Sequence, residues 1–167
     1  MDTHARPLEP DDAPDVRAID GAYARAYGLE PRAGEASLRF FARTGHAFVA
    51  VGEGGVRGYV LAQAVFDGER PTLFASRFAS PPPGDAEALR ALLRALTKSA
   101  YDAGVYDVRV ELPAEDAAGA AALDAERYRP AVTSVFARQL GSRAEAVAAA
   151  ARARDEDVGA EGGVERG

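Results

Sequence analysis

Two segments in the first third of the chain carry hydrophobic residues at helical spacing. The first segment predicts a helix that Asp11 or Asp12 caps and Gly28 ends. Its apolar face consists of Val16, Ile19, Tyr23 and Tyr27. A second helix is expected over residues 35–43, and a short strand over residues 6–8 comes before both helices. The chain is therefore expected to begin with one strand and two helices.

From residue 46 the pattern changes to that of strands. Three apolar segments, residues 46–52, 56–66 and 70–80, are separated by glycine-containing turns at residues 53–55 and 67–69. Turns this short join antiparallel neighbours. We therefore expect three consecutive antiparallel strands.

The most regular helical pattern follows three consecutive prolines, Pro81 to Pro83. Its apolar face consists of Leu89, Leu92, Leu93, Leu96 and Ala100, and its basic face of Arg90, Arg94 and Lys98. Gly104 ends this helix, and a strand over residues 105–113 follows. The strand's buried side is expected to carry Tyr106, Val108, Val110 and Leu112. A strand, helix and strand in this order predict a parallel crossover, so the sheet is expected to be mixed.

The last part of the chain contains an alanine-rich segment, a final strand pattern and a polar tail. A weaker helix is expected over residues 114–128 and a strand over residues 132–140. Residues 143–167 contain no aromatic residue, leucine or isoleucine, so we expect a tail that is partly helical or disordered. Residues 1–142 then form one domain of the α/β (α+β) class, with a mixed, mostly antiparallel central sheet flanked by about four helices.

Composition and charge exclude several classes of function. The formal net charge of -6 provides no basic field for nucleic acid or an anionic membrane. No cysteine is present, and two histidines without a closely spaced carboxylate set make a metal site unexpected. The N-terminal residues do not resemble a signal peptide, and no apolar run approaches the roughly 20 residues of a membrane span. We therefore expect a cytoplasmic protein.

The order of these elements resembles the GNAT acyltransferase superfamily over roughly residues 6–140. The stretches RFFARTGHAFVA, LAQAV, LLRALTKSAYDAGVYDV and LGSR are more narrowly similar to a small uncharacterised bacterial family with a GNAT-like fold. The superfamily resemblance implies acetyl-CoA or another acyl-CoA as co-substrate and a small-molecule or peptide amine as acceptor. In such a fold the ligand is expected at the carboxyl end of the strand before the crossover helix.

The expected phosphate-binding loop departs from the pattern of the superfamily. That pattern, Gln or Arg, two residues, Gly, one residue, then Gly or Ala, fits one register, in which Gly84 and Ala86 match. Pro81 replaces the Gln or Arg, and Pro82 and Pro83 lack N–H donors. The resemblance then implies a weakened site formed by the backbone of Phe78, Ala79, Gly84, Asp85 and Ala86 and by the side chain of Arg90. The alternative is a rigid proline spacer beside a solvated arginine.

The expected acyl-transfer centre is also altered, so no catalytic residue is assigned. Leu123 occupies the position at which many members of the superfamily have a tyrosine general acid, and the strand over residues 70–80 carries no carboxylate. His46 and Arg77 are candidates for the substrate cleft. The alternatives are that His46 packs or caps, and that Arg77 is an ordinary exposed strand residue.

Two functions are compatible with these patterns. The first is an acyl-CoA-dependent N-acyltransferase with a degenerate pyrophosphate loop. The second is a non-catalytic GNAT-like module that binds another small ligand or a protein partner, with a homodimer formed through the last strand as one form of it. The missing tyrosine and the missing strand carboxylate favour the second function, whereas the position of the loop favours the first.

Overall fold

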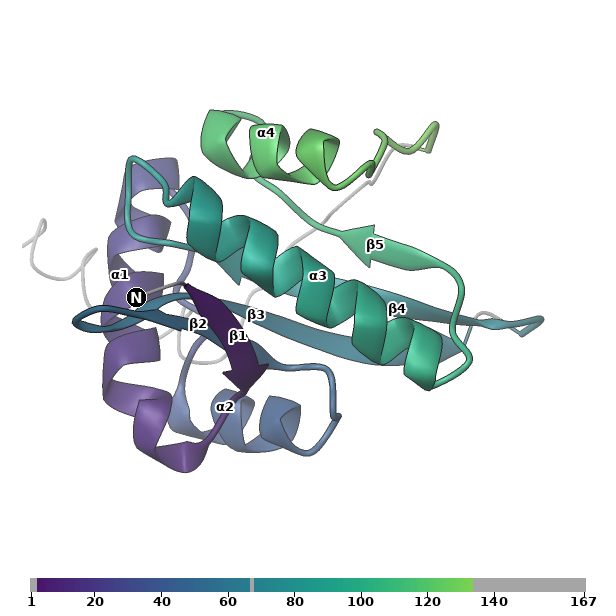
Figure 1. Cartoon of the computed structure of the whole chain (residues 1–167), viewed down its shortest axis with the longest axis horizontal. Coiled ribbons are helices and arrows are strands. Elements are labelled where there is room, and N and C mark those ends of the chain that lie inside the picture. The colour runs from purple at the N-terminus through teal and green to yellow at the C-terminus, as the bar shows by residue number, and fades with distance from the viewer. Residues whose placement is uncertain (1–2, 67, 134–167) are drawn as a thin grey trace, which may run out of the picture. The chain divides into compact units, whose positions relative to one another are not determined.

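A five-stranded mixed sheet organises the computed structural model of the chain, which describes residues 3–66 and 68–133 (Figure 1). The elements in chain order are β1 (His4–Pro7), a 3-10 turn η1 (Pro10–Asp12), α1 (Ala13–Tyr27), α2 (Glu35–Ala42), β2 (Phe48–Gly52), β3 (Gly55–Phe66), β4 (Pro71–Ala79), α3 (Ala86–Asp102), β5 (Val108–Val110) and α4 (Ala117–Ala125). The strand order is β1-β2-β3-β4-β5, and only β4 and β5 are parallel. The expected fold class, a mixed and mostly antiparallel sheet with four helices, is confirmed.

The two faces of the sheet are covered by different helices. The leucine face of α3 packs on one side together with Ala62, Ala75 and Phe78, whereas α1 and α2 pack on the other side with Leu61 and Ala79 (Figure 1). Neighbouring strand residues therefore alternate between two separate cores, as the pleat requires. The crossover through α3 places the N-terminus of this helix directly after the carboxyl end of β4.

A β-bulge in β4 changes which residues face which core. Leu61 of β3 pairs with Arg77, but the next residue, Ala62, pairs with Ala75, so Ser76 is the extra residue. Before the bulge Ala75 faces α3, and after it Phe78 does so. The bulge therefore turns Arg77 towards α1.

One expectation about the β5 segment is wrong. Tyr106 was expected on the buried side of the strand, but its exposed fraction is 81% and its ring makes an edge contact with the exposed Tyr101. The strand begins only at Val108, so Tyr106 lies in the preceding loop, where strand alternation does not apply.

The predicted final strand and tail cannot be compared with this fold. Residues 134–167 lie outside the described residues, so the strand over 132–140, the boundary at residue 142 and the tail over 143–167 remain predictions. Within the part of the chain that is described, no helix is both long enough and apolar enough to span a membrane.

Candidate functional site

Strands β4 and β5 stop pairing in the middle of β4. Their register covers only Leu73 to Ala75, and the last contact is the Glu111 N–H donating to the carbonyl oxygen of Ala75 at 3.0 Å. Strand β4 continues to Ala79, so Phe78 and Ala79 have no partner residue on β5. On the side that faces β5, Phe78 and Ala79 therefore have no strand partner within residues 3–66 and 68–133, although both pair with β3 on the other side. We call this the unpaired end of β4, and it lies where the ligand is expected, before the loop that leads into α3.

Two main-chain N–H groups of the loop between β4 and α3 donate hydrogen bonds to other atoms of the same loop. The Gly84 N–H donates to the Pro81 carbonyl oxygen at 3.0 Å, and the Asp85 N–H donates to Ser80 Oγ at 2.9 Å. Ala86 begins α3, where first-turn N–H groups have no acceptor within the helix. Two of the N–H groups expected to hold a phosphate are therefore bonded inside the loop.

Asp85 and Gly84 hold the loop against neighbouring elements. Asp85 caps α3, because its carboxylate accepts the Ala88 N–H at 3.1 Å, and it pairs with Arg57 at 2.6 Å. Gly84 has φ +119°, and a Cβ atom there would overlap the Cβ of Ala118 in α4. Only glycine fits this contact, so the start of α4 lies against the loop.

Arg90 and Arg94 share one acceptor, although both side chains are exposed to solvent. Both donate from Nε to Glu126 Oε1, Arg90 at 2.9 Å and Arg94 at 3.1 Å. Partial burial alone would raise the pKa of Glu126, but the hydrogen bonds from the two arginines outweigh it, so the pKa is lowered. The position of Arg90 on an exposed face agrees with the solvated arginine of the alternative interpretation, but its guanidinium already has an acceptor in Glu126.

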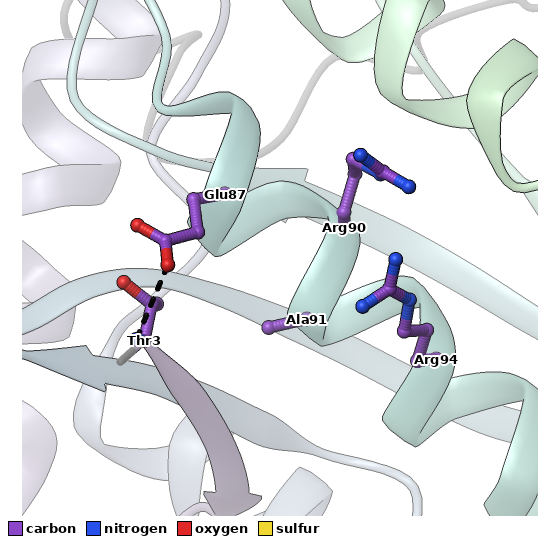
Figure 2. Close-up of a pocket in the computed structure, with 5 residues that line it drawn as sticks. All are labelled: Thr3, Glu87, Arg90, Ala91 and Arg94. Carbon is purple, nitrogen blue, oxygen red and sulfur yellow. Dashed lines mark hydrogen bonds between the residues drawn. The ribbon is translucent and has the colours of Figure 1, made fainter. Parts of the chain in front are cut away.

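The same arginines border a hollow on the outer surface of α3. Figure 2 shows Thr3 and Glu87 hydrogen-bonded on one side of it and Arg90 and Arg94 on the other, with Ala91 between them. The hollow has a volume of about 220 Å³. Any phosphate that approached this surface would compete with Glu126 for the two guanidinium groups.

A buried carboxylate, Asp20, organises the opposite face of the sheet. Its exposed fraction is 1%, and it accepts hydrogen bonds from the Tyr59 hydroxyl at 2.5 Å and from the N–H groups of Arg32 at 2.6 Å and Ala33 at 2.8 Å. Burial and the bond to Asp20 raise the pKa of Tyr59. Asp20 therefore fixes the loop between α1 and α2 onto the sheet.

Arg77 completes this buried cluster, so its interpretation as an exposed strand residue is wrong. Its Nε lies 3.0 Å from Asp20 Oδ1, although the N–H does not point at the oxygen, and its Nη2 donates to the Glu30 carbonyl oxygen at 2.6 Å. The guanidinium also lies 5.7 Å from the centre of the Tyr23 ring. The bulge at Ser76 is the physical reason, because it turns Arg77 towards α1.

A second buried carboxylate, Asp116, joins α1 to the segment after β5. It accepts the Tyr23 hydroxyl at 2.6 Å and the Tyr27 hydroxyl at 3.3 Å, and it caps α4 by accepting the Gly119 N–H. Burial, followed by the bond to Asp116, raises the pKa of Tyr23. The region beside the unpaired end of β4 thus contains two buried acids that sequence reasoning missed. The only signal for Asp20 is its helical register with Val16 and Tyr23 on the buried face of α1.

His46 lies on the other face of the sheet from Arg77. Its Nδ1 is 3.0 Å from the Ser99 hydroxyl on α3, and that hydroxyl donates to the Leu96 carbonyl oxygen. The Ser99 hydroxyl thus connects His46 to the main chain of α3. The structure does not bring the two cleft candidates together.

The buried position of His46 leads to a prediction about how thermal stability depends on pH. Burial lowers the pKa of His46 from the ordinary value of 6.5, so as the pH falls through 6.5 the unfolded chain binds a proton more readily than the folded chain. The melting temperature of the wild type should therefore fall more between pH 7.5 and pH 5 than that of the His46→Gln variant. The exposed His4→Gln variant is the matched control, and equal pH dependence in all three proteins would contradict the prediction.

A metal centre receives no support from the described part of the chain. Within residues 3–66 and 68–133, no three histidine, aspartate or glutamate side chains are grouped as a metal ion would require.

Comparison with solved structures shows the type of fold. The fold matches a ribosomal-protein-alanine N-acetyltransferase from Brucella melitensis biovar Abortus 2308, with 16% identity, a TM-score of 0.64 and coverage of 83% of this chain and 99% of that chain. It also matches AAC(6')-Iy in complex with the bisubstrate analog CoA-S-monomethyl-acetylneamine, with 14% identity, a TM-score of 0.65 and coverage of 84% and 100%. The chain has a GNAT-like fold.

The particular family is shown by closer matches. The chain belongs to a protein family of unknown function, DUF1999, whose model matches residues 6–155. TTHA1254 from Thermus thermophilus is 39% identical, with a TM-score of 0.72 and coverage of 84% of this chain and 99% of that chain. No curated protein matches the chain.

Proposed function

We propose that this protein is an acyl-CoA-dependent N-acyltransferase that uses acetyl-CoA or a related thioester. The observation that carries the proposal is the unpaired end of β4, where Phe78 and Ala79 continue beyond the last β5 contact at Ala75. Ligands in open sheets bind where neighbouring strands separate, at the carboxyl ends of strands. The fold-level likeness to acetyltransferases, one of them solved with a CoA analog, supports the same assignment.

The main chain of β4 can supply the electrostatic part of the reaction. An N–H group of Phe78 or Ala79 would donate to the thioester carbonyl oxygen, where negative charge develops when an amine attacks. Holding the thioester and the amine next to each other, where β4 and β5 separate, would further raise the reaction rate, because the reaction would then resemble an intramolecular one. No side chain on α4 is needed as a proton donor in this scheme, which is consistent with Leu123 at the expected tyrosine position.

Binding of the CoA diphosphate is expected to be weak. Pro82 and Pro83 offer no N–H group, and each lost donor to a charged phosphate is worth roughly 1.5–3 kcal/mol. The N–H groups of Gly84 and Asp85 and the side chain of Arg90 already have acceptors in the chain. We therefore expect a dissociation constant on the order of 1 mM rather than 1 μM.

Calorimetric titration with acetyl-CoA tests the proposal. Saturable binding in the millimolar range is expected, and the Glu126→Gln variant should bind about 3- to 10-fold more tightly because Arg90 and Arg94 lose their competing carboxylate. Asp102→Asn is the matched control, since it releases Lys98 on the same helix. The absence of binding to both the wild type and Glu126→Gln would overturn the proposal.

A non-catalytic module remains the second candidate, and the closed loop favours it. The internal bonds of Gly84 and Asp85 and the contact of Gly84 with Ala118 leave the loop satisfied without a ligand. Under this alternative, acetyl-CoA would not bind to any of the variants, and no amine would be acylated in its presence.

A further inference from the structure

Arg32 lies at the point where β4 and β5 separate. Its Nη1 donates to the carbonyl oxygen of the bulge residue Ser76 at 2.7 Å and lies 3.3 Å from Glu111 Oε2. Ser76 follows the last residue of β4 that pairs with β5, and Glu111 makes the last main-chain contact from the β5 side. The positively charged Arg32 and the negatively charged Glu111 therefore lie side by side where β4 and β5 separate.

The position of Arg32 is fixed by buried groups rather than by its exposed side chain. Asp20 accepts the main-chain N–H of Arg32, and Arg77 donates to the carbonyl oxygen of Glu30 in the same loop. Both Asp20 and Arg77 are almost fully buried. The main chain of Arg32 is therefore held beside the point where β4 and β5 separate, which places its side chain within reach of that point.

Arg32 and Glu111 are nevertheless accessible to a small molecule. Their side chains are 47% and 51% exposed, and 3.3 Å is long for an ion pair between charged groups. An exposed pair of this kind contributes little to stability, so its separation by a ligand costs little.

We propose, building on the transferase function above, that the acceptor is an α-amino acid or a comparably small zwitterion with its carboxylate beside the amine. Arg32 binds the acceptor carboxylate, and Glu111 binds the ammonium group. Because the two side chains lie next to each other, the ligand that can engage both of them is one whose own two charges are close together. An amine without a neighbouring carboxylate leaves Arg32 without this partner.

The proton balance of the reaction follows from these roles. Glu111 takes a proton from the ammonium group, and the free amine then attacks the thioester carbonyl carbon. A C–N bond forms, the C–S bond breaks, and the CoA thiolate leaves. The proton lost from the amide nitrogen passes to the thiolate through solvent, and Glu111 releases its proton to water. The products are the N-acyl amino acid and free CoA.

The test compares acceptors that differ only in the carboxylate. Release of CoA thiol from acetyl-CoA is followed with each of the twenty amino acids, and for an active one with its amide and its decarboxylated amine, for example leucine, leucinamide and 3-methylbutylamine. The wild type should favour the amino acid by about 10- to 100-fold in kcat/KM, and Arg32→Gln should remove that preference by raising KM for the amino acid alone. Arg109→Gln, an exposed arginine on the same strand segment as Glu111, is the control and should retain it.

Each outcome separates the two proposals. Turnover with equal rates for the amino acid, amide and amine would overturn the acceptor assignment and leave the transferase intact. No turnover with any amino acid would overturn the acceptor assignment, and the calorimetric titration with acetyl-CoA would then decide the transferase separately. Calorimetric titration with leucine would then test the role of Arg32. The proposed site is contradicted if leucine does not bind, or if the Arg32→Gln variant binds leucine as tightly as the wild type does.

Discussion

Replacing Asp20 by alanine is expected to lower the free energy of unfolding by about 3–5 kcal/mol, because Arg77 would remain buried without its counter-charge. The same change removes the acceptor for the Tyr59 hydroxyl and for the N–H groups of Arg32 and Ala33. Urea denaturation followed by circular dichroism measures the loss. The variant should also lose the defined position of Arg32 where β4 and β5 separate.

Two further variants distinguish a buried charge from a general effect of mutation. Asp20→Ala combined with Arg77→Met should be more stable than Asp20→Ala alone, since no uncompensated charge then remains in the core. Asp124→Ala removes an exposed carboxylate that pairs with Arg129, and it should change stability by less than about 0.5 kcal/mol. A loss below about 1 kcal/mol for Asp20→Ala would show that the cluster does not hold the loop.

The parts of the fold that depend on local pattern could be predicted from the sequence. The leucines of α3 recur at helical spacing, and Asp85 stands where a helix cap is expected, so the crossover helix and its start are recovered. The three central strands alternate and are joined by short turns. Residues 105–113 show the limit of this reasoning, because alternation was extended to Tyr106, which precedes the strand.

The buried cluster could not be predicted, because it depends on a change of register. The face of a strand residue follows from counting by twos, and the bulge at Ser76 reverses that count for Arg77. Asp20 could be placed on the inner face of α1 by its spacing, but its partners come from β3, β4 and the α1–α2 loop. Such long-range contacts leave no periodic signal. The expected position of a ligand, at the carboxyl end of β4, followed from the crossover topology alone, and no residue in the sequence indicated where β4 and β5 separate.

The prolines of the loop provide the most direct test of the CoA site. Replacing Pro82 and Pro83 by glycine restores two N–H donors beside the N-terminus of α3, and donors to a charged phosphate are worth roughly 1.5–3 kcal/mol each. Ordering each glycine costs up to about 1 kcal/mol of this gain. We therefore expect the dissociation constant for acetyl-CoA to fall by about 10- to 100-fold, measured by calorimetry.

The control for this change is another proline that lies away from the loop. Pro10→Gly, in the turn before α1, alters the entropy of the unfolded chain in the same way and should leave CoA affinity unchanged. Adding Glu126→Gln to the double glycine variant should increase affinity further, since Arg90 and the new N–H groups would bind different oxygens of the ligand. If the glycines do not change affinity, the contact of Gly84 with Ala118 has closed the site, and the loop then serves to pack α4 against the sheet rather than to hold a phosphate.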